Sequence, residues 1–217
     1  MNDKVNKTII ITLFVLGIVF TAIGSTFAFY VASIGQSGSQ ISGKTYTFNV
    51  SLDVTTIESS KLIPVDDDLI IETLNSSHVC EDTRGYGLCT LHLIRFTNNG
   101  TAQTMSGNIK TISSTYATNN LKYQLFTLSG SRYTAISSAT SINNTANATN
   151  YFKLNDTDVT VSLSDGTNSS TTNDVYLAIW ISDPGSNQLA DQNKSFTGQV
   201  SFSSTHGDTI TSSFINS

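Results

Sequence analysis

Strict alternation of apolar and polar residues is the feature of this chain that most limits its fold. From Tyr46 to Val54 every second residue is apolar, with Thr, Asn, Ser or Asp between. The same alternation returns from Phe196 to Phe202, where Gly198 takes one of the inward positions. Because successive side chains of a strand point to opposite sides of a sheet, this period of two indicates strands with one buried face.

Four shorter runs rich in β-branched and aromatic residues lie between these two stretches, and clusters of Gly, Asn, Ser and Asp separate them: 88–96, 121–129, 158–164 and 174–182. Such spacing is typical of strands joined by turns. The last two runs lie closest to continuous apolar runs, which predicts central strands covered on both faces. The alternating stretch at 194–205 is expected to be the closing strand of the domain.

After residue 44 no stretch has a convincing helical period. Residues 62–74 could carry one short helical turn, and two polar stretches, 137–150 and 165–174, are expected to be exposed loops. About eight short strands without intervening helices predict an all-β fold, an antiparallel two-sheet sandwich of jelly-roll or immunoglobulin-like type. The 217 residues of the chain have room for one such domain, 45–217, after an N-terminal segment.

The N-terminus has the pattern of an export signal. Lys4 and Lys7 precede an uncharged stretch, Ile9–Ile34, whose most apolar part ends at Gly24. Its length lies between the about 7 to 15 residues of a secretory signal core and the about 20 of a membrane-spanning helix. Residues 1–28 are therefore a signal peptide cleaved after Ala28 or a retained hydrophobic anchor helix, and both place the domain outside the cell.

A short ordered motif spans the junction between this segment and the polar part of the chain. It consists of Gly24, Thr26, Ala28 and Phe29, followed by Gly43 and the alternating run 46–54. This order resembles the start of the TasA/camelysin family of secreted biofilm-matrix fibre proteins. The resemblance covers only the beginning of the chain, and it implies a sandwich of jelly-roll type.

The resemblance also implies a way of assembling. In related filaments the segment after the signal peptide leaves its own subunit and adds as a strand to the next, through backbone hydrogen bonds and alternate side chains. Residues 29–44 are expected to be exposed, and 29–41 to be this donor strand, with Phe29, Val31 and Ser33 on one face. The expected function is that of a secreted structural subunit of an extracellular or cell-surface filament. Its main partner is a second copy, and other matrix or cell-surface components are further candidates.

Two other functions remain open at this point. If the apolar segment is retained, the protein is a membrane-anchored surface β-domain, an adhesin or an envelope-layer component, and it contacts the membrane only through that segment. Camelysin-like proteins have been classed as metallopeptidases, but His78, His92 and His206 form no paired ligand spacing. Because no nucleophile, phosphate-loop or dinucleotide motif occurs either, the sequence predicts neither an enzyme nor a cofactor.

The charge of the chain restricts its partners. Charged residues make up 12% of the sequence, and the formal net charge is −5. Proteins that bind nucleic acid usually concentrate Lys and Arg in a patch or stripe, and none is present. Nucleic acid is therefore not an expected partner.

Cys80 and Cys89 are the only cysteines, and an exported chain meets an oxidising environment in which two thiols tend to pair. Gly85 and Gly87 between them allow the turn that a disulfide requires. The alternative, a metal or redox pair, would need C-x-x-C spacing or histidine partners.

Two surface features complete the set of candidate sites. The run Asp66, Asp67 and Asp68 could supply carboxylate ligands to calcium, although no calcium-loop motif surrounds it and a solvated acidic turn is the simpler interpretation. Asn143 and Asn147 begin Asn-x-Thr triplets in a predicted loop, so they are the preferred acceptors if the protein is glycosylated.

Overall fold

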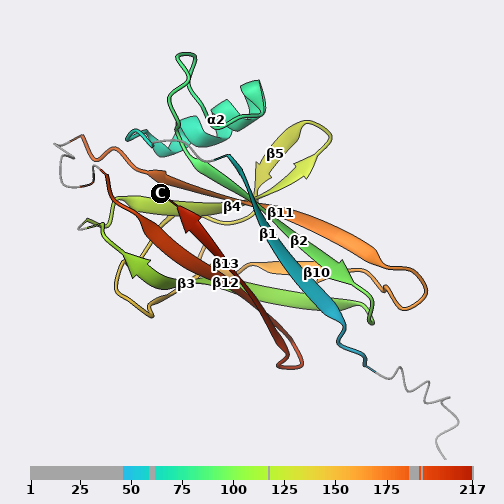
Figure 1. The fold of residues 1–217 in the computed structure, drawn as a ribbon. Coiled ribbons are helices and arrows are strands. Elements are labelled where there is room, and N and C mark those ends of the chain that lie inside the picture. The colour runs from blue at the N-terminus through green and yellow to red at the C-terminus, as the bar shows by residue number, and fades with distance from the viewer. Residues whose placement is uncertain (1–45, 59–61, 117, 186–190, 192, 217) are drawn as a thin grey trace, which may run out of the picture. The chain divides into compact units, whose positions relative to one another are not determined.

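The computed structural model describes residues 46–58, 62–116, 118–185, 191 and 193–216, and these form two antiparallel sheets (Figure 1). The first sheet has the order β1 (Val50–Glu58), β2 (Thr90–Asn98), β11 (Thr171–Ile181), β4 (Leu121–Ser129) and β5 (Arg132–Ala135), with β6 (Thr140–Ser141) also paired to β4. The second has the order β10 (Thr160–Leu163), β3 (Gln103–Ser114), β12 (Phe196–Ser204) and β13 (Thr209–Asn216), with β7 (Thr149–Tyr151) also paired to β3. A small hairpin joins β8 (Lys153–Leu154) to β9 (Thr157–Asp158).

The predicted all-β, antiparallel two-sheet sandwich is confirmed. From β2 to β12 the chain passes back and forth between the sheets, because β2, β4 and β11 lie in the first sheet whereas β3, β10 and β12 lie in the second. Each strand therefore contributes one row of side chains to the space between the sheets, as in β-sandwiches generally. Along β12, for example, buried and half-buried residues alternate without a break from Phe196 to Ser204.

Aromatic side chains fill the middle of this space. Phe202 packs edge-on against Phe96, with ring centroids 4.8 Å apart, and stacks on Phe152 at 5.8 Å. Gly107 on β3 makes room for it, because a Cβ at that position would lie only 2.3 Å from the Phe202 ring. Glycine is required at this position inside a strand because the Phe202 ring lies close to the backbone, and not because the chain turns there.

A helix covers one end of the outer face of the first sheet. Helix α2 (Asp67–Ser77) buries Ile70 and Leu74, which are one turn apart, in a second apolar cluster that includes Trp180. The expectation of at most one short turn in 62–74 is wrong. Asp66 occupies the N-cap position, and Asp67 and Asp68 lie in the first turn, where negative charge interacts favourably with the helix dipole.

The strand predictions are right for the long runs and wrong at several positions. The first strand begins at Val50 rather than near Tyr46, and β3 and β13 were not expected at all. Because β13 follows β12, the stretch 194–205 does not close the domain. The run 158–164 forms β10 at the edge of its sheet rather than at its centre.

The two predicted loops are also more structured than expected. Residues 137–150 contain β6 and the start of β7, and they bury Ser137, Ile142 and Asn150. Strand β11 begins at Thr171, inside the predicted loop 165–174. Both errors arise because polar side chains here satisfy backbone groups: Asn150, for instance, donates to the Ile109 carbonyl at 3.1 Å.

Candidate functional site

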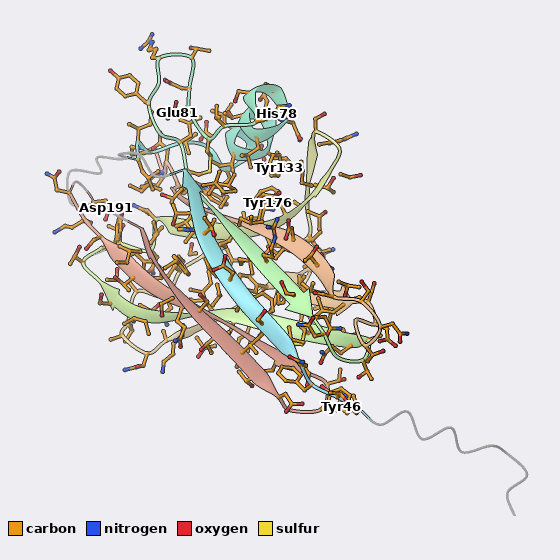
Figure 2. The ribbon with its side chains drawn as sticks, turned by 45° about the vertical axis from the view of Figure 1, so that its right-hand side comes forward. Tyr46, His78, Glu81, Tyr133, Tyr176 and Asp191 are labelled. Carbon is orange, nitrogen blue, oxygen red and sulfur yellow. A yellow bond between two sulfur atoms is a disulfide. The ribbon has the colours of Figure 1, made fainter. Side chains whose placement is uncertain are left out.

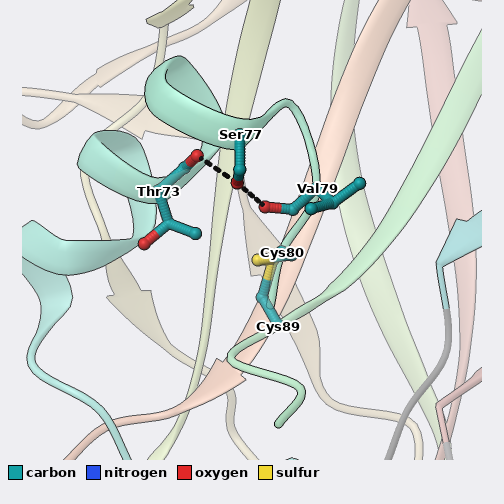
Figure 3. The surroundings of a disulfide bond; sticks show 5 residues. All are labelled: Thr73, Ser77, Val79, Cys80 and Cys89. Atoms are coloured by element: carbon teal, nitrogen blue, oxygen red, sulfur yellow. Dashed lines mark hydrogen bonds between the residues drawn. A yellow bond between two sulfur atoms is a disulfide. The ribbon is translucent and has the colours of Figure 1, made fainter. Parts of the chain in front are cut away.

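The sequence-predicted disulfide is present. Cys80 and Cys89 are both buried, with Cα atoms 5.3 Å apart, and the bond closes the loop between α2 and β2 (Figure 3). Next to it the Ser77 hydroxyl lies 2.9 Å from the carbonyl oxygens of Thr73 and Val79, which fixes the end of the helix. A disulfide is typical of proteins exposed to an oxidising compartment, so this pair agrees with an extracellular location.

Replacing both cysteines with serine should lower the free energy of unfolding by about 2 to 3 kcal/mol, because a short closed loop no longer restricts the unfolded chain. Urea denaturation of the wild type and the double variant measures this difference. Reduction of the wild type with dithiothreitol should give the same loss. Equal midpoints for the oxidised and reduced proteins would contradict the prediction.

The middle residue of the acidic run at the start of α2 is engaged in protein contacts. Asp67 forms an ion pair with Lys122 and accepts a hydrogen bond from Trp180 Nε1 at 2.9 Å. Partial burial alone would raise the pKa of Asp67, but hydrogen bonds from Lys122, Trp180 and Ser182 together lower it. Among the described residues no group of three or more His, Cys, Asp or Glu could hold a metal ion. The calcium hypothesis for Asp66, Asp67 and Asp68 therefore gains no geometric support.

The three histidines lie in three different environments. His78 ends α2 in a left-handed conformation, and His206 lies on the exposed turn between β12 and β13. His92 is fully buried between the sheets, where its Nδ1 lies 3.0 Å from the Thr56 hydroxyl and its ring lies 4.6 Å from that of Phe214. Burial lowers the pKa of His92 from 6.5 to about 4, so its ring is neutral at pH 7. Its Nε2 has no hydrogen-bond partner among the described residues.

Both predicted glycosylation acceptors are at the surface. Asn143 and Asn147 are exposed, and the Asn143 side-chain oxygen accepts a hydrogen bond from the Thr145 amide at 3.0 Å. Their accessibility agrees with the prediction that they are the preferred acceptors.

The predicted donor strand lies outside the described residues. This holds for Phe29, Val31 and Ser33, and for the whole of residues 1–28 and 29–44. None of the helices in the described ranges has the length and apolar character needed to cross a membrane.

An incompletely covered seam lies where the described chain begins. Within the described part of the chain, β1 pairs only with β2 and β13 only with β12, so each strand is the edge of its sheet. The two edges are neighbours, as Figures 1 and 2 both show. We call this region the β1–β13 seam; its apolar side chains, which pack on the core and remain half-buried, are Phe48, Val50, Leu52, Val54 and Ile210.

The two edges of the seam run in the same direction. At one end Tyr46, before β1, contacts Ser204 and Asp208, before β13. At the other end Thr56 contacts His92, which packs against Phe214 near the end of β13. Ile57 and Ile215 also lie at this end and are 47% and 63% exposed, with Ile215 on the outer face because the preceding Phe214 points into the core. One incoming strand could therefore run antiparallel to either edge and cover the half-buried row.

A cluster around Tyr46, which we call the Tyr46 clasp, fixes the start of the described chain (Figure 2). The Tyr46 hydroxyl lies 2.9 Å from Gln103 Oε1, 3.1 Å from Ser204 Oγ and 3.2 Å from Asp208 Oδ2. Its ring stacks on His206, with centroids 3.7 Å apart. Sequence reasoning placed Tyr46 inside a strand and missed both the clasp and the seam. The alternation of Ile210, Ser212 and Phe214 is the signal that could have revealed the second edge.

Comparison with known proteins adds little. No described protein family and no curated protein matches the chain. The crystal structure of Spo0M, a sporulation control protein from Bacillus subtilis, aligns with 78% of this chain at 4% identity and a TM-score of 0.34. The chain spans 49% of that structure, about half its length. ACE19, the collagen-binding subdomain of the Enterococcus faecalis surface protein ACE, aligns with 58% of this chain and 85% of its own at 9% identity and a TM-score of 0.20. Neither score supports an argument about function.

Proposed function

We propose that this protein is an exported structural subunit of an extracellular or cell-surface filament, in which residues 29–41 of one copy add as a strand along the β1–β13 seam of the next. The observation that carries the proposal is the seam itself. Two long neighbouring edges and a row of half-buried apolar side chains form a surface that an added strand would complete.

Unpaired edges normally carry features that block association, such as inward charges, Pro or very short length. Strand β1 has nine residues and no proline, and the inward side chains Val50, Leu52 and Val54 are apolar. Strand β13 has eight residues and is equally free of proline. Leaving such edges exposed favours pairing with another chain, which is the mode of recognition that strand addition uses.

The proposed donor has matching chemistry. Residues 29–41 contain no charged side chain, and the aromatic and β-branched residues Phe29 and Val31 fall on one face of an extended strand. The segment is long enough to follow β1 along its whole length. The Cys80–Cys89 disulfide supports the exported location that assembly outside the cell requires.

Deleting residues 29–41 from the mature protein should leave a folded monomer that forms no filaments, as seen by negative-stain electron microscopy and sedimentation. The domain should keep its thermal transition because its own strands are intact. A synthetic peptide with the sequence of residues 29–41 should bind the truncated domain. Filaments of normal appearance from the truncated protein would refute the proposal.

The seam is tested separately with exposed residues, whose replacement is least harmful to folding. The double variant Ile57→Lys and Ile215→Lys should bind the peptide at least tenfold more weakly, because two charges would then flank the added strand. The matched control is Leu128→Lys with Leu154→Lys, which alters exposed apolar residues elsewhere. If the Ile57→Lys and Ile215→Lys variant bound the peptide as tightly as the control variant, the acceptor site would lie outside the seam.

The uncharged stretch Ile9–Ile34 favours one second candidate, a membrane-anchored surface domain. This alternative expects Met1-containing protein that partitions into detergent. Native protein that begins at Phe29 and stays in the aqueous phase would exclude it.

A further inference from the structure

A cleft with an apolar floor lies between α2 and the loop that the disulfide closes. It has a volume of about 550 Å³, and its apolar lining includes Ile63, Val65 and Leu88. Leu69 and Val79 also line it, although the two residues are 42% and 41% exposed to solvent. Large apolar side chains exposed side by side in a concave surface are typical of binding sites.

The walls of this cleft are held in place. The buried Cys80–Cys89 disulfide fixes one wall, and Ile70 and Leu74 fasten α2 to the sheet on the other. Asp82 accepts hydrogen bonds from the amides of Arg84 and Tyr86, at 2.8 and 2.9 Å, which shapes the intervening loop. A partner would therefore meet a preformed surface and lose little free energy in ordering it.

Carboxylates surround the apolar floor. Asp66, Glu81, Asp82 and Asp183 line the cleft itself. A second hollow, of about 790 Å³, shares Asp66, Leu69 and Asp183 with the first and adds Asp67 and Asp68. The two hollows together are lined by six carboxylates and one amine, that of Lys122, which is already paired with Asp67. The continuous surface, which we call the α2 cleft, is thus strongly negative with an aliphatic floor.

We infer that the α2 cleft binds a polypeptide segment of another protein in which Lys or Arg residues flank aliphatic side chains. The aliphatic side chains would cover Leu69 and Val79, while the cations would lie against the carboxylates on the rim. Complementary charge of this kind guides association and selects the partner. The inference rests on other residues than filament assembly does, because none of the residues that line the cleft belongs to the β1–β13 seam. The cleft lies beside α2 and Glu81 (Figure 2).

The test uses the full mature protein and a fluorescein-labelled peptide of alternating Lys and Leu, with binding followed by fluorescence anisotropy. Saturable binding is expected at low salt, and it should weaken at least tenfold in about 0.5 M NaCl, where charges are screened over a few ångströms. A peptide with Glu in place of Lys should not bind. Absence of saturable binding at low salt, or equal binding of the Glu peptide, would overturn the inference.

Charge-matched variants locate the site. The triple variant Asp66→Asn, Glu81→Gln and Asp183→Asn keeps the size of each side chain and should bind the Lys–Leu peptide at least tenfold more weakly. The control triple variant, Glu72→Gln, Asp156→Asn and Asp158→Asn, removes the same charge from exposed positions that do not line the cleft and should bind as the wild type does. Equal weakening of both variants would mean that net charge alone attracts the peptide, which overturns the assigned site. Leu69→Ser should also weaken binding at least threefold, and wild-type affinity in that variant would contradict a role for the apolar floor.

Discussion

The variant Phe202→Ala should lose about 3 to 5 kcal/mol of its free energy of unfolding, because truncating a buried aromatic residue removes its contacts and leaves a cavity. Phe202 is 1% exposed and lies between Phe96 and Phe152 in the middle of the sandwich. The surrounding sheets can close this space only in part, because the other large side chains packed between them hold them apart. Equilibrium denaturation in urea measures the loss as a shift of the midpoint.

Two controls make this prediction specific. Phe202→Leu should cost less than Phe202→Ala, because Leu fills part of the space beside Gly107. Ser201→Ala, one residue earlier on the outer face of the same strand, should change stability by about 0.5 kcal/mol or less. A loss below 1 kcal/mol in Phe202→Ala, with an unchanged denaturant slope, would show that Phe202 is not central to the core.

Lowering the pH from 7 to 4 should reduce the stability of the domain through His92 by about 3 kcal/mol. The pKa of His92 is lowered from 6.5 to about 4 by burial, so the folded domain excludes a proton that the unfolded chain binds. The contribution of His92 to stability is fully present above pH 6.5 and is lost as the pH decreases toward 4. Each unit of difference between the two pKa values corresponds to about 1.4 kcal/mol of free energy of unfolding. The lowered pKa of Asp67 acts at still lower pH, below its ordinary value of 3.8.

The variant His92→Leu separates this contribution from all others. Its stability relative to the wild type should improve steadily as the pH falls from 6.5 to 4, whatever its absolute value at pH 7. The measurement is a series of urea midpoints at half-unit pH steps for both proteins. Parallel pH profiles would contradict a buried neutral His92.

The sequence pattern predicts those strands whose inward residues are large and apolar. The run 121–129 coincides with β4 because Leu121, Tyr123 and Leu125 all point into the core. The same reasoning does not find strand β3, because its inward row combines Gly107 and Thr111 with Met105 and Ile109. Gly107 and Thr111 interrupt the apolar alternation that indicates a strand. The ring of Phe202 fills the space beside Gly107.

Helix α2 and most of the candidate site could not be predicted from the sequence, for other physical reasons. Only Ile70 and Leu74 of the helix are buried, which is too few to produce a periodic signal, and the preceding aspartates suggest a turn when read alone. The cysteine pair could be predicted because its chemistry is local. The β1–β13 seam depends on which strands end up at the edges, and that follows from the connection order of the whole domain. Likewise the α2 cleft brings Asp66, Glu81 and Asp183 together from segments far apart in sequence.

The Tyr46 clasp has a mechanical consequence. A pull on the N-terminal segment would first load the contacts of Tyr46 with Gln103, Ser204 and Asp208 rather than the first rungs of β1. Once the clasp yields, force directed along β1 would act across its hydrogen bonds to β2, which stand perpendicular to the strands and would be strained together rather than one after another. The domain therefore resists tension along β1 in two stages. The contacts of Tyr46 break first, and the hydrogen bonds between β1 and β2 then break together.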